Sequence, residues 1–317
     1  MPATVSARPS KAALFTAFAL VYVIWGSTYL GIRFAIESLP PLLMAGTRYA
    51  LAGGLLYGFM RLRGAPRPPL RSWGVALLIG GCLLTFGNGG VTLGEQYLSS
   101  GLAALLVATV PMLLALLGWA SGVSARPTPV AALGLGLGLA GVYLLAQASA
   151  GSGSAVARPG HAGLGIACVL TAALVWAIGS LYGKNHRAAA SPFVAGGMQM
   201  LCGGLVMVVL GLLRGEAQHL HLAAVSAKSW WAYAYLVTFG SLVAFTAYVW
   251  LLQAVEPALA GTYAFVNPVV AVGLGWAFAG ERLSWPMLGG GALVVAAVAL
   301  LLLGSRAPAA AATTNAD

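Results

Sequence analysis

The segment WGSTYLGIRFAIESLPPLLMAGTR at residues 25–48 returns in altered form as WAIGSLYGKNHRAAASPFVAGGMQ at residues 176–199. Three landmarks keep an offset of 151 positions, namely Trp25 and Trp176, Arg33 and Lys184, and Pro41 and Pro192. At the same offset, Gln199 stands where the first half has Arg48. Two related halves in an apolar chain are typical of a membrane transporter whose binding site lies where the halves meet.

The repeat continues toward the end of each half. TFGN at 85–88 returns as TFGS at 238–241, so that Ser241 stands where the first half has Asn88. Pro111 and Trp119 return as Pro268 and Trp276. The correspondence therefore extends over most of the chain.

The composition identifies a polytopic membrane protein. Of the 317 residues, 60% are hydrophobic and only 7% are charged, whereas soluble domains carry about 25% charged residues. We interpret the net charge of +10 as loop charge that sets membrane topology, and we expect no nucleic-acid partner because there is no basic domain to bind one.

Ten segments are apolar over about the 20 residues that a membrane-spanning helix needs. We expect a first repeat at 12–147, a Gly/Ser/Ala-rich linker at 148–162, a second repeat at 163–303, and cytoplasmic tails at 1–11 and 304–317. The ten predicted spans are 12–33, 42–60, 73–94, 99–120, 128–147, 163–184, 192–213, 230–253, 258–279 and 286–303.

The Lys and Arg residues predict the orientation of these spans. With the N-terminus in the cytoplasm, ten of them fall on the cytoplasmic side and four on the outer side, which favours cytoplasmic termini. The cluster between Arg61 and Arg71 contributes most to this difference. Because each repeat has five spans, the second repeat must enter the membrane from the opposite side, and the two repeats are then inverted.

Three charged residues are candidates for an outer gate or for ion coupling. Arg48 lies within the second predicted span, where it either snorkels to the interface or faces a cavity. Arg33 and Glu95 end spans at the same outer side, and charge-assisted bonds among the three could close a gate. Two simpler interpretations stay open: Glu37 pairs with Arg33 four residues before it, and Glu95 is a solvated helix-end carboxylate.

Other polar and aromatic residues also fall within the spans. Pro111 and Pro268 predict helix breaks whose freed carbonyls can contact a substrate, although ordinary bending is the alternative. Asn88 and Asn267 add amides near midspan. Aromatic rings there can line a cavity for flat or cationic molecules, or simply belong to the core or the interfacial belt. These rings are Trp25, Tyr29, Trp176, Tyr182, Tyr248, Trp250 and Tyr263.

Several motifs are excluded as sites. The GLGLAG at 136–141 lies inside an apolar span and indicates close helix packing rather than dinucleotide binding. Together with Gly289–Gly291 it offers small faces through which helices 5 and 10, the spans predicted at 128–147 and 286–303, could form a homodimer. There is no P-loop, and the single aspartate is Asp317. The histidines lie in loops, and Cys82, Cys168 and Cys202 form no CxxC pair. We therefore expect no enzyme, metal or cofactor.

Four stretches resemble the EamA family of the drug/metabolite transporter superfamily. They are WGSTYLGIR at 25–33, LPPLLMAGTRY at 39–49, TFGNGGVTLGEQYLSSGLAALLVATVP at 85–111 and ALAGTYAFVNPVVAVGLGWAFAGERLSW at 258–285. The resemblance covers roughly residues 14–303. It implies ten transmembrane helices in two inverted five-helix repeats, in the inner membrane of a bacterium, around a central cavity.

The same resemblance implies export of small metabolites, amino-acid-like or drug-like, as the two repeats rock around the cavity. Carried onto this chain, it makes seven residues candidates for substrate binding: Trp25, Tyr29, Asn88, Trp176, Tyr248, Tyr263 and Asn267. A passive facilitator for the same molecules, without ion coupling, is the alternative. The partners expected are therefore a small-molecule substrate and membrane lipid.

Overall fold

In the computed structural model, all secondary structure in the described part of the chain is helical. The structure describes residues 10–98, 103, 106–150, 162–186, 188–189, 191–279 and 285–304. Both predicted tails and the linker lie largely outside these ranges, as do Arg8, Arg158, Arg187, Arg282, Arg306 and Asp317. Among the described residues of the predicted tails and linker, Lys11, residues 148–150, Ala162 and Gly304 belong to helices.

Five helical segments among the described residues are long and apolar enough to cross a membrane: Lys11–Ala35, Leu70–Gly94, Gly163–Asn185, Pro192–Leu213 and Ala227–Ala254. Shorter apolar helices cover Val110–Ala120, Pro129–Leu144 and Leu288–Gly304. Many large apolar side chains, such as Phe15, Leu55 and Val209, are exposed on the outside of the bundle, where lipid replaces water. The chain is thus an all-helical, multi-pass membrane protein.

The helices of the first half are α1 (Lys11–Ala35), α2 (Pro41–Leu62), α3 (Leu70–Gly80), the π-helix η1 (Gly81–Asn88), α4 (Gly89–Gly94), α6 (Val110–Ala120) and α7 (Pro129–Ala150). Those of the second half are α8 (Ala162–Asn185), α9 (Pro192–Leu213), α10 (Ala227–Tyr235), the π-helix η4 (Leu236–Phe245), α11 (Thr246–Ala254), α12 (Pro257–Ala260), α13 (Tyr263–Ala279) and α14 (Trp285–Gly304). Two short 3-10 helices, η2 (Glu216–His219) and η3 (Leu222–Ala224), lie between α9 and α10.

The helix starts follow from local sequence. Pro41 and Pro192, the matching prolines of the repeat, each occupy the first position of a helix, where a missing N–H has no intrahelical partner to lose. Ser10 and Ser226 cap α1 and α10 by accepting a backbone N–H three residues later. Gly215 follows α9 with a φ of 76°, a conformation that favours glycine.

The repeated TFG motif adopts the same unusual conformation in both halves. TFGN at 85–88 lies in η1, and TFGS at 238–241 lies in η4. π-helical segments are rare and occur frequently at functional sites. Each is inserted into a longer continuous helix, α3–η1–α4 in the first half and α10–η4–α11 in the second.

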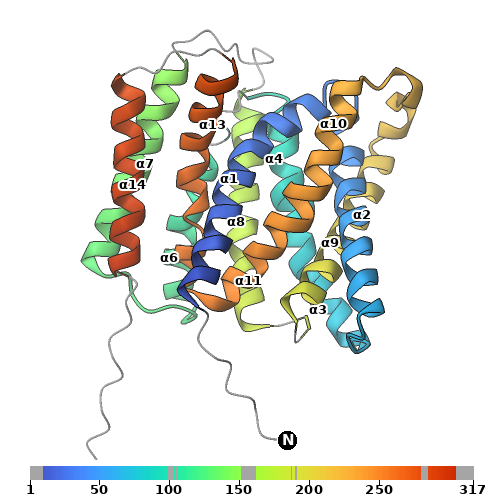
Figure 1. Ribbon diagram of the computed structural model, residues 1–317, viewed down its shortest axis with the longest axis horizontal. Helices are drawn as coiled ribbons and strands as arrows, with labels where there is room; N and C mark the ends of the chain where they lie inside the picture. Colours follow the sequence, from blue (N-terminus) through green and yellow to red (C-terminus); the bar gives the residue numbers. More distant parts are fainter. Residues whose placement is uncertain are drawn as a thin grey trace, which may run out of the picture.

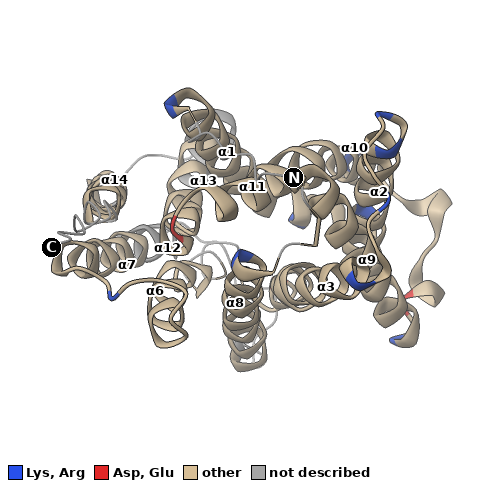
Figure 2. Cartoon of the chain, turned by 90° about the horizontal axis from the view of Figure 1, so that it is seen from below, with Lys and Arg blue, Asp and Glu red and all other residues tan. Residues whose placement is uncertain are grey.

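Equivalent helices of the two halves pair with each other. Helix α2 packs along α9, and α7 packs along α14; these two pairs stand at opposite ends of the molecule (Figures 1 and 2). Figure 2 also shows how few Lys, Arg, Asp and Glu residues the bundle carries. Helices α1 and α8 lie between the pairs and each packs against the other half: α1 against α10, η4, α11 and α13, and α8 against α3, η1, α4 and α6.

Glycines allow both pairs to approach closely. A Cβ on Gly53 of α2 would lie 2.3 Å from the backbone nitrogen of Leu201 in α9. In the other pair, a Cβ on Gly141 of α7 would lie 2.8 Å from the carbonyl oxygen of Gly290 in α14. The small faces predicted for close packing therefore meet within one chain, and a homodimer through α7 and α14, which stays a proposal, would have to use the other sides of these helices.

Candidate functional site: a cavity between the two halves

A cavity with about 620 Å³ of empty space, part of it open to the outside, lies between helices of both halves. Helices α1, α2, α4, α6, α8 and α13 and both π-helices contribute to its wall. Six of the seven predicted substrate-binding residues line it, together with Arg48: Trp25, Tyr29, Asn88, Trp176, Tyr263 and Asn267.

Aromatic rings from both halves close one end of the cavity. The ring of Trp25 lies 5.6 Å from that of Trp176 and 4.7 Å from that of Tyr263, measured between centroids and with edge-to-face geometry. From these rings the wall continues through Tyr29 and Ile32 toward the C-terminal end of α1. The cavity therefore extends from an aromatic floor toward the end of the bundle where α1 ends.

The predicted residue Tyr248 lies behind this floor rather than on the cavity wall. Its side chain is fully buried, and its hydroxyl accepts a hydrogen bond from Trp176 Nε1 at 3.0 Å. The same hydroxyl contacts Ser180 Oγ at 2.8 Å. Trp25 Nε1 donates to the carbonyl of Gly240 at 3.1 Å. Because both indole N–H groups have acceptors, both rings are held in fixed orientations.

The two repeated motifs meet crosswise at the floor. Gly87 of the first half lies against Trp176 of the second, where a Cβ would be 2.8 Å from the indole ring. Gly240 of the second half lies against Trp25 of the first through the hydrogen bond described above. The repeated tryptophans and glycines are therefore the sequence signal for the floor.

Arg48 forms the polar part of the wall. Its side chain is only 2% exposed, so it does not extend to the surface as the snorkelling interpretation requires. Nη2 donates to Asn88 Oδ1 at 2.7 Å and to the Tyr49 hydroxyl at 2.8 Å, and the guanidinium carbon lies 4.4 Å from the Tyr49 ring centroid. Nε and Nη1 have no hydrogen-bond partner within the described residues.

Asn267 lines the cavity beside the proline of α13. Its side chain is 2% exposed, and its Oδ1 has no hydrogen-bond partner among the residues described. Pro268 lies inside α13, which continues from Tyr263 to Ala279 without the predicted break at this proline. Pro111 differs from the prediction: it is the second residue of α6, and the turn at 108–109 precedes it. The break in the first half therefore comes before the proline.

Glu95 follows directly after the membrane-crossing segment Leu70–Gly94 and is buried, with 9% exposure. The solvated helix-end interpretation is therefore wrong. Both carboxylate oxygens lack a hydrogen-bond partner in the part of the chain that is described. Burial raises the pKa of the Glu95 carboxyl to about 8, and the charges of Arg48 and Arg33 oppose this rise.

The predicted outer gate is not closed by ion pairs in this conformation. Within the described residues, Glu95 makes no salt bridge with Arg33 or Arg48, and Arg33 is exposed. Glu37 also differs from the local prediction, because its carboxylate pairs with Lys228 Nζ at 2.7 Å instead of with Arg33.

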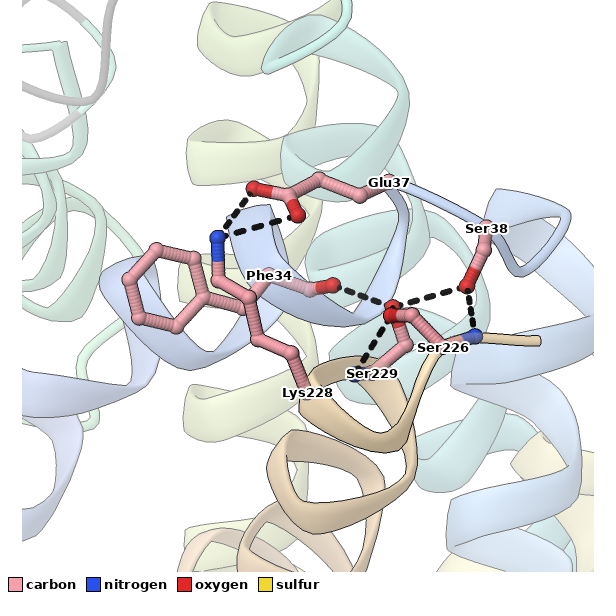
Figure 3. A network of polar contacts seen from close by, with 6 residues as sticks. All are labelled: Phe34, Glu37, Ser38, Ser226, Lys228 and Ser229. Carbon is pink, nitrogen blue, oxygen red and sulfur yellow. Dashed lines mark hydrogen bonds and ion pairs between the residues drawn. The ribbon is translucent and has the colours of Figure 1, made fainter.

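Figure 3 shows this ion pair within a network that ties the end of α1 to α10. Lys228 Nζ lies 3.8 Å from the Phe34 ring centroid. Ser229 Oγ donates to the Phe34 carbonyl at 2.7 Å and accepts from Ser38 Oγ at 2.8 Å. The network joins the two halves and couples α1 to the helix it packs against.

The second half does not supply a matching polar wall. Gln199 and Ser241, at the positions equivalent to Arg48 and Asn88, are buried but do not line the cavity. The charge of the wall therefore comes from the first half, whereas the second half contributes the Asn267 amide. The prediction from sequence missed a group of mainly small and apolar wall residues: Thr28, Ile32, Tyr49, Gly87, Val91, Val107, Val110, Ala172, Ala173 and Gly240.

The described residues contain no group of three or more His, Cys, Asp or Glu side chains that could hold a metal ion. A multi-pass helical protein with a central cavity lined by both halves has the architecture of a membrane transporter. The chain belongs to the EamA-like transporter family, which matches it over residues 12–147 and 163–303.

Curated relatives agree with this family. The chain is 41% identical over 280 residues to the inner membrane transporter YedA of Escherichia coli (strain K12), itself described as uncharacterized, and the match covers 87% of each chain. It is 27% identical over 285 residues to the uncharacterized transporter YvbV of Bacillus subtilis (strain 168), over 89% of this chain and 88% of the relative. These relatives make the chain a multi-pass inner membrane transporter of bacterial type.

A solved structure, described only as a crystal structure of a protein, has the same fold. It superposes with a TM-score of 0.75 at 19% identity and covers 94% of this chain and 99% of its own.

Proposed function

We propose that this protein is a secondary transporter that exports small amphipathic metabolites, amino-acid-like or drug-like, across the inner membrane by alternating access. The observation that carries the proposal is the cavity between the halves, whose wall combines aromatic rings with one buried arginine. Apolar walls with a few placed polar groups are typical of small-molecule sites.

The architecture we propose is ten membrane spans in two inverted repeats. The pairing of α2 with α9 and of α7 with α14 supports it, because each pair joins equivalent helices. The crosswise contacts of Trp25 with Gly240 and of Trp176 with Gly87 support it as well. The start of α1 and the end of α14 lie at the same end of the bundle (Figure 1), and the excess of Lys and Arg in the segments expected on that side supports a cytoplasmic location for it.

In this mechanism, the moving bodies combine helices of both repeats. One body contains α1 with α10, α11 and α13, and the other contains α8 with α3, α4 and α6, because these helices pack together. This differs from a simple rocking of one repeat against the other. The network of Phe34, Glu37, Ser38, Lys228 and Ser229 supports α1 and α10 moving as a unit.

Contacts between the two bodies close the cytoplasmic end. Lys184 Nζ, at the end of α8, donates to the Val255 carbonyl at 2.7 Å, just after α11. Gln253 Nε2 donates to the Gly183 carbonyl at 2.9 Å. The aromatic floor lies between these contacts and the cavity, which supports assigning this conformation to the state that faces outward. In the opposite state, Arg33, Arg48 and Glu95 would form the charge-assisted closure of the outer end.

The experiment that tests this function is counterflow in proteoliposomes that contain the purified full chain. Labelled amino acids and cationic dyes are offered with and without an imposed pH gradient. Saturable uptake of one class is the expected result, and acceleration by the gradient would identify proton coupling. Saturable flux indifferent to the gradient would identify a facilitator, and absence of flux for every compound would contradict the proposal.

A further inference from the structure

The cavity wall contains a cationic group whose hydrogen-bonding capacity is incompletely used. A guanidinium carries five N–H groups and has no acceptor. In Arg48, both short hydrogen bonds start from Nη2 and end on neutral acceptors, Asn88 Oδ1 and the Tyr49 hydroxyl. Nε and Nη1 are buried and make no hydrogen bond to any described residue. Buried N–H groups without acceptors are costly, so the site favours a ligand that supplies one.

The side of an arginine guanidinium that carries Nε and Nη2 is well suited to bind a carboxylate. Nε and Nη2 carry parallel N–H groups that bind the two oxygens of a carboxylate together. On this side Nε is buried without a partner among the described residues, and Nη2 is held by groups that carry no charge. A carboxylate that displaces one neutral acceptor gains two charge-assisted bonds, while the Asn88 or Tyr49 side chain is released toward the cavity that it already lines.

The charge of the wall points in the same direction. Arg48 is the single charged side chain among the described wall residues, and Glu95 is not one of them. In a partly dehydrated cavity, Arg48 attracts an anion and repels a cation. The aromatic floor of Trp25, Trp176 and Tyr263 then faces the uncharged body of the ligand, and the Asn267 amide offers a further hydrogen bond.

We propose that the cavity binds small organic acids with an apolar or aromatic body, and that Arg48 receives their carboxylate. This rests on the transporter function proposed above and narrows its substrates from amphipathic molecules in general to anionic ones. The cationic molecules that the aromatic residues alone suggested are then poor ligands.

The test compares three probes of similar shape on the purified full chain in lipid nanodiscs. They are 3-phenylpropionate, its neutral amide and the cation 3-phenylpropylamine, and binding is followed by tryptophan fluorescence and thermal stabilisation. We expect saturable binding of the acid with at least about tenfold weaker binding of the amide and the amine, a difference of about 1.4 kcal/mol. Equal or tighter binding of the amide or the amine, or no binding of the acid, would overturn the inference.

Variants assign the preference to Arg48. Arg48→Gln places in the first half the residue that the second half carries as Gln199, and it should abolish the preference for the acid over the amide. Arg71→Gln removes the same charge from an exposed position in α3 and should retain the preference. Retention of the preference by Arg48→Gln would overturn the inference. If Arg48→Gln does not fold, the comparison of the three probes on the unmodified protein still decides.

The two proposals fail in different ways. Counterflow of cationic dyes without binding of the acid would overturn the carboxylate inference and leave the transporter function intact. Binding of the acid through Arg48 without counterflow of any compound would support the inference and contradict the transporter function.

Discussion

Arg48 Nη2 donates to Asn88 Oδ1 at 2.7 Å and so links α2 to the π-helix η1 across the cavity wall. The equivalent residues of the second half, Gln199 and Ser241, each have a buried oxygen without a hydrogen-bond partner among the described residues. The repeat thus preserves the backbone framework, while the charged side chain of the cavity wall, Arg48, is present in the first half alone. This asymmetry gives the cavity its charge.

Replacement of Arg48 tests whether this contact serves transport or folding. We expect Arg48→Ala to lower counterflow at least about tenfold, while the yield of monodisperse protein falls much less, because the lost group contacts the cavity. Flux per milligram and size-exclusion profiles measure the two effects, with Arg71→Ala as the charge-matched control. Equal losses of flux and yield would show that Arg48 is a structural residue.

Replacement of Glu95 tests the effect of a buried, unpaired carboxyl on stability. Because the pKa of Glu95 is raised to about 8 from 4.5, its contribution to the free energy of unfolding is most favourable while it is protonated in both the folded and unfolded states. This contribution is lost as the pH rises from about 4.5 to about 8. Arg48, Arg33 and Tyr29 are the charged and titratable groups that act on this carboxyl. Glu95→Gln should therefore remove much of the fall in melting temperature between about pH 5 and about pH 9.

The control for this experiment is Glu37→Gln, which neutralises an exposed carboxylate already paired with Lys228. Exposed pairs contribute little to stability, so this variant should keep the pH dependence of the unmodified protein. A Glu95→Gln profile that runs parallel to the unmodified profile would show that Glu95 does not cause the fall.

Ligand affinity should follow the same titration. Ionised Glu95 provides a competing negative charge near Arg48, so the affinity for 3-phenylpropionate should fall as the pH rises through about 8. Glu95→Gln should flatten this dependence. Fluorescence titrations at several pH values measure it, and an affinity that rises with pH would contradict the prediction.

The hydroxyl of Tyr248 should stabilise the floor of the cavity. Tyr248→Phe leaves Trp176 Nε1 without its acceptor and removes the contact with Ser180, which should cost about 1–3 kcal/mol in the free energy of unfolding. Tyr233→Phe, which removes a longer, exposed hydrogen bond to Thr47 at 3.2 Å, is the control. Thermal unfolding distinguishes them, and equal melting temperatures would argue against this role.

Neighbouring glycines of α2 should respond oppositely to alanine. A Cβ on Gly53 would lie 2.3 Å from Leu201 N and 2.7 Å from the Gly197 carbonyl oxygen, whereas a Cβ on Gly54 meets nothing within 4 Å. Gly53→Ala should therefore cost about 1–3 kcal/mol or more through displacement of α9. Gly54→Ala should be neutral or slightly stabilising, since alanine is the better helix former. Melting temperatures and folded yields provide the comparison, and tolerance of Gly53→Ala would mean that the two helices are less closely packed.

The amino-acid sequence predicted the features that depend on composition and spacing. Apolar content indicated a helical membrane protein, and the spans predicted at 42–60 and 192–213 do begin at the matching prolines Pro41 and Pro192. The repeated Trp25 and Trp176 identified the centre of the site, because a residue that recurs at a constant offset occupies equivalent places in both halves. Most of the predicted cavity residues also line the cavity.

The tertiary structure decided which polar groups meet. Glu37 pairs with Lys228, 191 positions away, rather than with Arg33 four residues before it. Tyr248 lies behind the cavity because α11 directs it toward Ser180 and Trp176. Glu95 is buried without a partner among the described residues, although its place at a helix end suggested exposure. Spacing along one helix fixes only which residues share a face, and the neighbours of that face depend on how separate helices pack.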